Sequence, residues 1–264
     1  MVTLLAIMLV GLFLGMRHAT DPDHVIAVTT IVSRQRSIRQ AALIGVFWGI
    51  GHTITIFGVG TAIILFSVVI PPRIGLSMEL SVGLMLILLG ILNLTGTMRW
   101  INERFAPSGC AQQTLLQADA TSASATAGKA SLEAQHELRA RQCWLASMVG
   151  KVGLFQALRP LVVGIVHGLA GSAAVALLVL TTIRNPWWAL VYLLVFGIGT
   201  IVGMMFVTSA IAMPIAYSGK EFAGFRQALV VASGLLSIGF GCFLTYQNGL
   251  VNGLLTNHPH WTPH

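Results

Sequence analysis

The sequence predicts an all-α polytopic membrane protein whose six transmembrane helices form two inverted three-helix repeats. Hydrophobic residues make up 55% of the 264 positions and charged residues only 9%, whereas about a quarter of a soluble domain is charged. Several apolar runs also exceed the roughly 18 residues that mark a membrane-spanning helix. The net charge of +7 does not indicate nucleic acid as a partner, because fourteen of the fifteen Lys and Arg residues lie between the apolar runs.

Six apolar segments follow one another along the chain. We delimit them at residues 3–32, 41–70, 76–98, 160–183, 187–217 and 227–246. The pair Pro71-Pro72 ends the second segment and Asn185-Pro186 ends the fourth, because proline lacks the backbone N–H that a continuing helix needs. Pro214 lies inside the fifth segment and is expected to bend its last turns.

The Lys and Arg residues predict the orientation of these segments. Twelve of the fifteen lie in three alternate connections, at residues 34–39, 99–159 and 220–226. The opposite side carries only Arg73 and Arg184, and Arg17 lies inside the first segment. Because cytoplasmic loops are enriched in Lys and Arg, both termini are predicted to be extracytoplasmic in a multi-pass protein of the inner (plasma) membrane of the cell.

The connection after the third segment divides the chain. Residues 106–140 are rich in Ala, Ser, Thr and Gln, a composition that cannot bury enough surface to fold alone. Cys110, Cys143 and Cys242 have no paired spacing, which predicts neither a disulfide framework nor a thiolate metal site. We expect a first three-helix repeat at 1–98, a cytoplasmic and largely disordered linker at 99–158, a second three-helix repeat at 159–246, and an extracytoplasmic His-containing tail at 247–264.

Glycine-containing motifs recur in the same order in both halves of the chain. They are Gly15-Met-Arg-His18 with Gly164-Ile-Val-His167, Gly49-Ile-Gly51 with Gly197-Ile-Gly199, and Gly83 and Gly90 with Gly234 and Gly241. The offsets of 149, 148 and 151 residues are nearly constant, as an internal duplication predicts. With three segments in each half, the second copy enters the membrane from the opposite side, and such inverted repeats place a transport site near the midplane. Convergent packing through small residues is the alternative.

A polar cluster interrupts the first apolar segment. Five ionisable side chains fall within the eight residues 17–24, and charged groups at membrane depth indicate a functional site. Asp21-Pro22 has the composition of a helix start, since Asp is a good N-cap and Pro suits the first helical position. The first segment is therefore expected to consist of two half-helices meeting at residues 18–22, with one kinked helix as the alternative.

The cluster offers the ligands of a transition-metal site. His18, Asp23 and His24 supply two imidazoles and a carboxylate, a set that suits Ni²⁺, Co²⁺, Zn²⁺ or Fe²⁺ rather than Cu⁺. His52 lies in the middle of the second segment and is predicted to be a further ligand, with a role in orienting the other ligands as the alternative. Because imidazole must be unprotonated to bind a metal, binding should depend on pH.

Other polar residues are weaker candidates. His167 is either an additional ligand or a hydrogen-bond partner between helices, and Asp21 is either an additional ligand or the ion-pair partner of Arg17. The path of the ion could further be lined by Thr53, Asn93 and Ser172. In the tail, metal capture before translocation is a candidate role for His258, His260 and His264.

The pattern His18-x4-Asp23-His24 inside a membrane span resembles the signature of the nickel/cobalt transporter (NiCoT) family. Together with Gly51-His52-Thr53 and the segment 167–172, it is most similar to the shorter, urease-accessory nickel permease branch of that family. The resemblance covers all six segments. It implies transport of Ni²⁺ or Co²⁺, and it implies that the signature residues are required for that transport.

The sequence thus predicts a secondary transporter for Ni²⁺ or Co²⁺ that acts in uptake, with the metal as transported substrate and with no prosthetic group. No G-x-x-x-x-G-K-[S/T] loop occurs, so the chain is not expected to be an ATPase. An efflux transporter of the same fold and an intramembrane metalloenzyme are the alternatives. The absence of an H-E-x-x-H motif argues against the enzyme.

Overall fold

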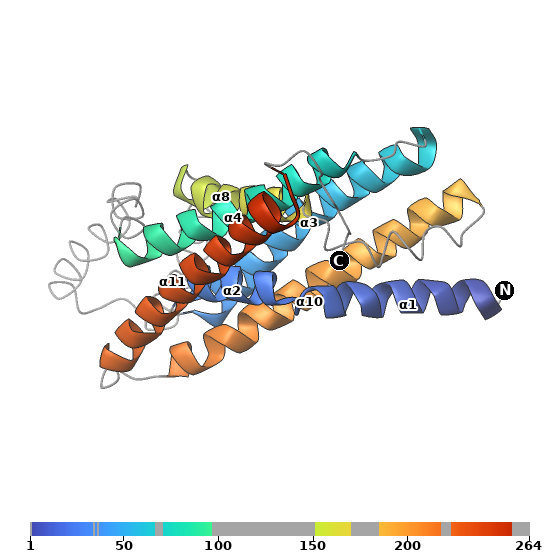
Figure 1. The fold of residues 1–264 in the computed structure, drawn as a ribbon. Coiled ribbons are helices and arrows are strands. Elements are labelled where there is room, and N and C mark those ends of the chain that lie inside the picture. Colours follow the sequence, from blue (N-terminus) through green and yellow to red (C-terminus); the bar gives the residue numbers. More distant parts are fainter. Residues whose placement is uncertain are drawn as a thin grey trace, which may run out of the picture. The chain divides into compact units, whose positions relative to one another are not determined.

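The computed structural model describes residues 2–33, 35, 37–66, 71–96, 151–169, 185–217 and 223–254 (Figure 1). Every regular element within these ranges is helical. In chain order the elements are α1 (Val2–His18), α2 (Pro22–Val32), α3 (Ile38–Phe66), α4 (Pro72–Leu94), α8 (Lys151–Gly168), α10 (Pro186–Tyr217), α11 (Ala223–Tyr246) and the π-helical turn η3 (Gln247–Val251).

The first apolar segment is broken in two, as the sequence predicts. The α1 helix ends at His18 and α2 begins at Pro22, with Asp21 as an extended N-cap residue at φ −60° and ψ 144°. Between them, the backbone N–H groups of Thr20 and Asp21 donate to the carbonyl oxygens of Arg17 and His18, at 2.9 and 3.1 Å. These turns satisfy backbone groups that lipid could not satisfy.

Four helices in the described part of the chain are long and apolar enough to cross a membrane. They are Ile38–Phe66, Pro72–Leu94, Pro186–Tyr217 and Gln227–Val251, and the shorter apolar helices are Leu5–His18, Pro22–Val32 and Ala157–Gly168. The shorter lengths of the first two follow from the break at residues 19–21, because each half-helix covers only part of one apolar segment.

Several predicted boundaries need correction. Helix α4 ends at Leu94 rather than at residue 98, because Gly96 takes a left-handed conformation with φ of 68°. Helix α8 starts at Lys151 rather than at Pro160, so that residues 151–158 are helical and Pro160 lies inside the helix. The residues before this proline are mainly good helix formers, and the proline removes one backbone hydrogen bond of the helix.

Two further boundaries in the second half of the chain differ from the prediction. Residues 247–251 continue α11 as a π-helical turn, although the sequence assigned them to the tail. The fourth apolar segment was predicted to run from 160 to 183, but α8 ends at Gly168 and Leu169 is a turn. Residues 170–184 and 255–264, like most of the predicted linker, lie outside the described residues.

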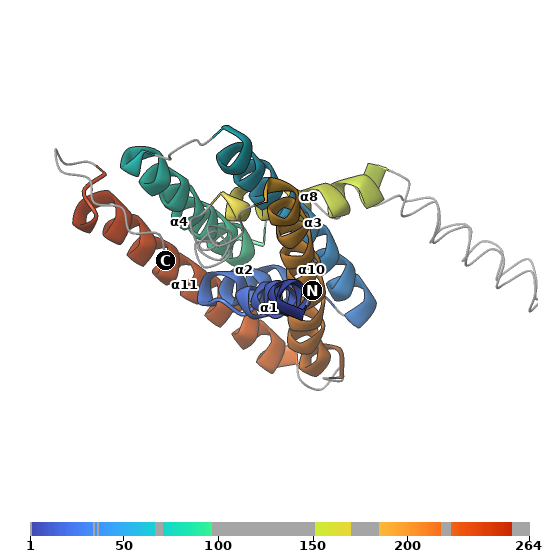
Figure 2. The same cartoon turned by 90° about the vertical axis from the view of Figure 1, so that its right-hand side faces the viewer.

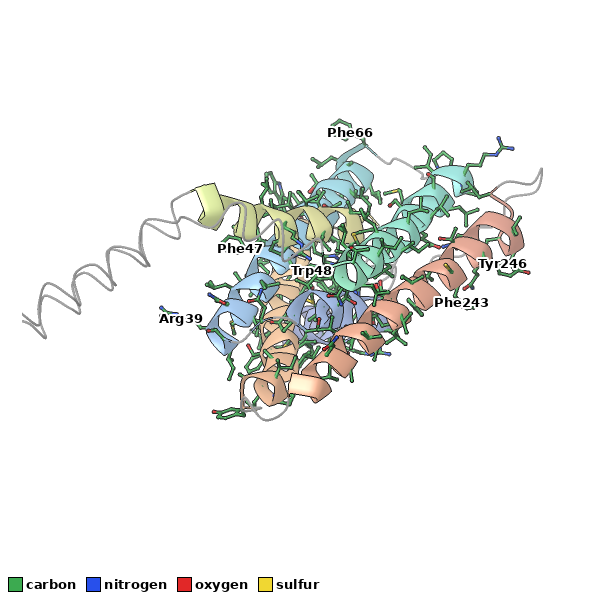
Figure 3. All side chains as sticks on the ribbon, turned by 90° about the vertical axis from the view of Figure 1, so that its left-hand side faces the viewer. Arg39, Phe47, Trp48, Phe66, Phe243 and Tyr246 are labelled. Atoms are coloured by element: carbon green, nitrogen blue, oxygen red, sulfur yellow. The ribbon has the colours of Figure 1, made fainter. Side chains whose placement is uncertain are left out.

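The outer surfaces of the helices are apolar. Leu84 on α4, Phe206 on α10 and Leu235 on α11 are 53%, 60% and 59% exposed, and large hydrophobic side chains on α1, α3 and α8 are exposed to a similar degree. Phe243 and Tyr246 point outward from α11, whereas Trp48 lies among the helices (Figure 3). Soluble monomers rarely expose apolar patches of this extent, so lipid is the surrounding that this surface fits.

Glycines bring four helices close together around the broken segment. A Cβ atom at Gly15 of α1 would overlap the carbonyl oxygen of Phe196 on α10, with which α1 lies side by side (Figure 2). A Cβ atom at Gly51 of α3 would likewise overlap the carbonyl oxygen of Leu161 on α8. Any side chain larger than the hydrogen of glycine at these two positions would push α1 away from α10 and α3 away from α8.

These close contacts recur in reverse between the two halves of the chain. In four cases a glycine of the first half meets a residue of the second half, and the corresponding glycine of the second half meets the corresponding residue of the first half. The reciprocal contacts are Gly15–Phe196 with Gly164–Trp48, Gly51–Leu161 with Gly199–Leu12, Gly49–Ile201 with Gly197–Thr53, and Gly83–Gly241 with Gly90–Gly234. The last pair joins α4 and α11, which lie side by side (Figure 1).

Candidate metal centre

The structure brings six of the predicted site residues together where the first segment breaks. His18 ends α1, Asp21 precedes α2, and Asp23 and His24 occupy the first turn of α2. From other helices come His52, in the middle of α3, and His167, in the last turn of α8. The four imidazoles are all buried, with exposed fractions of 6% or less. Four histidines enclosed in an apolar helical assembly are costly unless they bind something.

His18 is oriented by the N-cap residue of α2. Its Nδ1–H donates to Oδ2 of Asp21 at 2.8 Å, since a carboxylate can only accept. The Asp21 side chain makes no capping hydrogen bond to the helix that it precedes. An Arg17–Asp21 ion pair, one of the two roles that the sequence left open for Asp21, does not occur among the described contacts. The Asp21 carboxylate pairs with His18, three residues before it.

Asp23 joins two histidines from different helices. Its Oδ1 accepts a hydrogen bond from Nδ1–H of His24 at 3.1 Å, and its Oδ2 accepts one from Nε2–H of His167 at 3.1 Å. The carboxylate therefore connects α2 to the end of α8. His167, which the sequence left as either a ligand or an interhelical hydrogen-bond partner, is placed directly in the cluster.

The hydrogen bonds leave three imidazole nitrogens bare. His18 donates through Nδ1, so its Nε2 accepts from Nε2–H of His52 at 2.9 Å. By the same reasoning the remaining nitrogens of three rings carry lone pairs. Nε2 of His24, Nδ1 of His52 and Nδ1 of His167 are buried and have no hydrogen-bond partner. Unpartnered lone pairs of buried imidazoles are the atoms that a borderline metal ion would bind.

Two aromatic side chains cover the cluster, and the sequence reasoning did not assign them to it. The ring of Phe196 lies 5.7 Å from that of His18, and the ring of Trp48 lies 5.3 Å from that of His167. Both aromatic residues are buried, at 1% and 0% exposure. Their places beside the Gly197-Ile-Gly199 and Gly49-Ile-Gly51 motifs were the available signal, because a close helix crossing brings its neighbours inward.

The path candidates have other partners. Thr53 donates to the carbonyl oxygen of Gly197 at 3.2 Å, which ties α3 to α10. Asn93 donates to the carbonyl oxygen of Val230 and to Oγ of Ser233, at 3.1 and 3.2 Å, which ties α4 to α11. These are interhelical hydrogen bonds. Ser172 and the tail histidines His258, His260 and His264 lie outside the described residues.

Taken together, an apolar-faced helical assembly with a buried cluster of imidazoles and carboxylates defines a polytopic membrane protein with an internal polar site. Among the described residues, two groups have ligand atoms close enough to hold one ion: His18 with His24 and His52, and Asp23 with His24 and His167, with ligand atoms within 4.8 Å of one another in each group. Imidazole with carboxylate is a donor set for Ni²⁺, Co²⁺ or Zn²⁺.

The chain is similar along nearly its whole length to a curated protein. It is 34% identical over 256 residues to the urease accessory protein UreH of Bacillus sp. (strain TB-90), and the match covers 96% of each chain. The chain therefore belongs to the family of urease accessory protein UreH. None of the family models searched matches the sequence, and no solved structure matches it.

Proposed function

We propose that the chain is a secondary transporter that moves Ni²⁺ across the cytoplasmic membrane in the direction of uptake, with Co²⁺ as the alternative cargo. The single observation that carries the proposal is the buried cluster of His18, Asp23, His24, His52 and His167, in which three imidazole nitrogens have no partner. An ion held there would lie among helices long and apolar enough to cross a membrane.

The chemistry of the cluster favours a borderline divalent ion. Neutral imidazole and carboxylate suit nickel, cobalt and zinc, whereas thioether or thiolate ligands would indicate Cu⁺. Membership in the family of a urease accessory protein supports nickel among these metals, in keeping with the nickel/cobalt signature at His18, Asp23 and His24. A transporter rather than an enzyme fits a site enclosed by apolar helices.

The inverted repeat is part of this proposal. The reciprocal glycine contacts support it, because a pseudo-two-fold axis relating residues 1–98 to residues 159–246 would turn each contact into its counterpart. The hydroxyl of Ser237 donates to the carbonyl oxygen of Leu86 at 2.7 Å, and the offset of 151 residues relates these two positions to each other. Two inverted halves with a site at their interface are the usual build of a secondary transporter.

The remaining organisation is proposed from composition and charge. Residues 99–158, apart from the start of α8, form a cytoplasmic linker, and both termini are extracytoplasmic, as the Lys and Arg distribution indicates. In this arrangement the tail histidines His258, His260 and His264 capture metal on the outer side before it enters the helices.

The test is accumulation of radioactive nickel in cells that express the chain. Wild-type protein should raise cellular nickel above that of cells with an empty vector, and His18→Ala and Asp23→Asn should return it to that level. Membrane abundance of each variant is measured in parallel, so that loss of protein is not read as loss of transport. Unchanged accumulation in both variants would exclude this site, and nickel depletion by the wild type would establish export.

A further inference from the structure

The two groups of possible ligands overlap in one residue. We call His18, His24 and His52 the imidazole triad, and Asp23, His24 and His167 the carboxylate triad. Within each triad the ligand atoms lie within 4.8 Å of one another. Because His24 belongs to both triads, an ion with its full set of ligands in one triad leaves the other incomplete.

His24 is placed to serve either triad. Its ring centroid lies 4.8 Å from that of His18, 5.1 Å from that of His52 and 4.5 Å from that of His167. One nitrogen, Nδ1, faces Asp23 at 3.1 Å, and the other, Nε2, is buried without a partner. The His24 imidazole therefore contacts the Asp23 carboxylate through Nδ1, while the lone pair of its Nε2 has no partner.

Each triad includes a histidine at the end of a different helix, and that histidine lies beside a different aromatic ring. The imidazole triad contains the end of α1, where Phe196 covers His18 at 5.7 Å. The carboxylate triad contains the end of α8, where Trp48 covers His167 at 5.3 Å. The repeat offset of 149 residues relates His18 to His167, and the offset of 148 residues relates Trp48 to Phe196. Equivalent parts of the two halves thus cover the two triads.

We propose that the triads are two successive binding stations for a single metal ion, which passes between them by exchanging His18 and His52 for Asp23 and His167 while His24 stays bound. This inference rests on the proposed function. Each station supplies only three ligands, so the ion is held firmly enough to enter and loosely enough to leave, as permeation requires. Five protein ligands converging on one ion would instead favour retention.

The test is metal binding by the purified full chain in detergent, with Co²⁺ as the probe. Three variants separate the stations: His52→Ala removes only the imidazole triad, His167→Ala removes only the carboxylate triad, and His24→Ala removes both. Binding stoichiometry is measured by titration, and the ligands of the bound ion by X-ray absorption and visible spectroscopy. His52→Gln and His167→Gln, which keep side-chain volume, replace any alanine variant that does not fold.

Two stations predict a distinctive pattern. His52→Ala and His167→Ala should each keep one bound ion per chain while losing transport, and His24→Ala should lose binding. The ion in His167→Ala should have imidazole ligands without a carboxylate, and the ion in His52→Ala should have a carboxylate ligand. A single shared site is established instead if all three variants weaken binding alike and the wild-type ion has four imidazoles and a carboxylate. Wild-type protein that neither binds nor transports metal would overturn the proposed function itself.

Discussion

At the scale of single residues, Asp21 is the N-cap residue of α2, but its side chain contacts a histidine of the site. An Asp at an N-cap usually accepts a hydrogen bond from the backbone of its own helix, but this side chain binds His18 at 2.8 Å. The contact fixes which nitrogen of His18 carries the proton, and so which nitrogen is left for His52 or a metal. A carboxylate that orients a metal-binding histidine in this way commonly contributes to affinity.

Replacing Asp21 tests this role. Asp21→Ala should weaken Ni²⁺ binding by about 10–100-fold, the usual effect of removing a carboxylate that orients a histidine ligand. The helix should remain folded, because the side chain makes no capping hydrogen bond. Titration of the purified protein measures the affinity, and Asp119→Ala, in the proposed linker, is the matched control. Equal affinity in wild type and Asp21→Ala would show that His18 needs no orienting partner.

For Asn93, a role in holding α4 against α11 and a role in lining the ion path predict different effects of substitution. Its amide donates to Val230 and Ser233 across the α4–α11 contact. Asn93→Ala should therefore lower the free energy of unfolding by about 0.6–1.7 kcal/mol, the range measured for hydrogen bonds between membrane helices. Unfolding in mixed detergents measures this effect, and nickel affinity measured on the same sample should not change. Reduced affinity with full stability would place Asn93 on the ion path after all.

At the scale of the elements, close helix contacts hold the site together. Gly51 of α3 meets the backbone of α8 one residue before His52, so the same contact sets the position of that imidazole. Gly58 lies on the same helix two turns later and has open space where a side chain would be. Substituting each glycine in turn therefore distinguishes the effect of helix propensity, which both positions share, from the effect of the α3–α8 contact, which only Gly51 makes.

Gly51→Val should destabilise the protein by about 1–3 kcal/mol, the usual cost of overpacking, and weaken metal binding because α3 and α8 move apart. Gly58→Val, the matched control, should leave both properties nearly unchanged. Thermal unfolding in detergent, followed by tryptophan fluorescence, measures stability. A similar loss in both variants would mean that valine acts through helix propensity rather than through the α3–α8 contact.

The elements also show what a sequence pattern can and cannot predict. The break at residues 18–22 was predictable, because Asp21-Pro22 is a local signal of a helix start. The start of α8 at Lys151 was not, because Pro160 gives the same local signal but lies inside a helix that its neighbours sustain. Asp23, His24 and His18 were predictable as one local group, whereas the contacts of Phe196 and Trp48 with the cluster depend on how distant helices cross.

At the scale of the whole molecule, the proposal requires that the two halves enter the membrane from opposite sides. The charge distribution then places both termini on the outer face. Reporter fusions test this: an alkaline phosphatase joined after residue 264 should be active, and one inserted near residue 120 should be inactive. The reverse pattern would mean that the termini are cytoplasmic. Activity at both positions would place them on the same side of the membrane and so contradict the three spans proposed between them.

The central claim is that the buried histidine–aspartate cluster moves nickel through the membrane. Its most direct test is nickel flux into sealed vesicles that contain only the purified protein and lipid, reported by a nickel-sensitive dye inside. Wild-type protein should give flux that saturates with nickel concentration, and Asp23→Asn, reconstituted to the same density, should give the background leak. Equal flux from the two proteins, or no flux above leak from the wild type, would contradict the account.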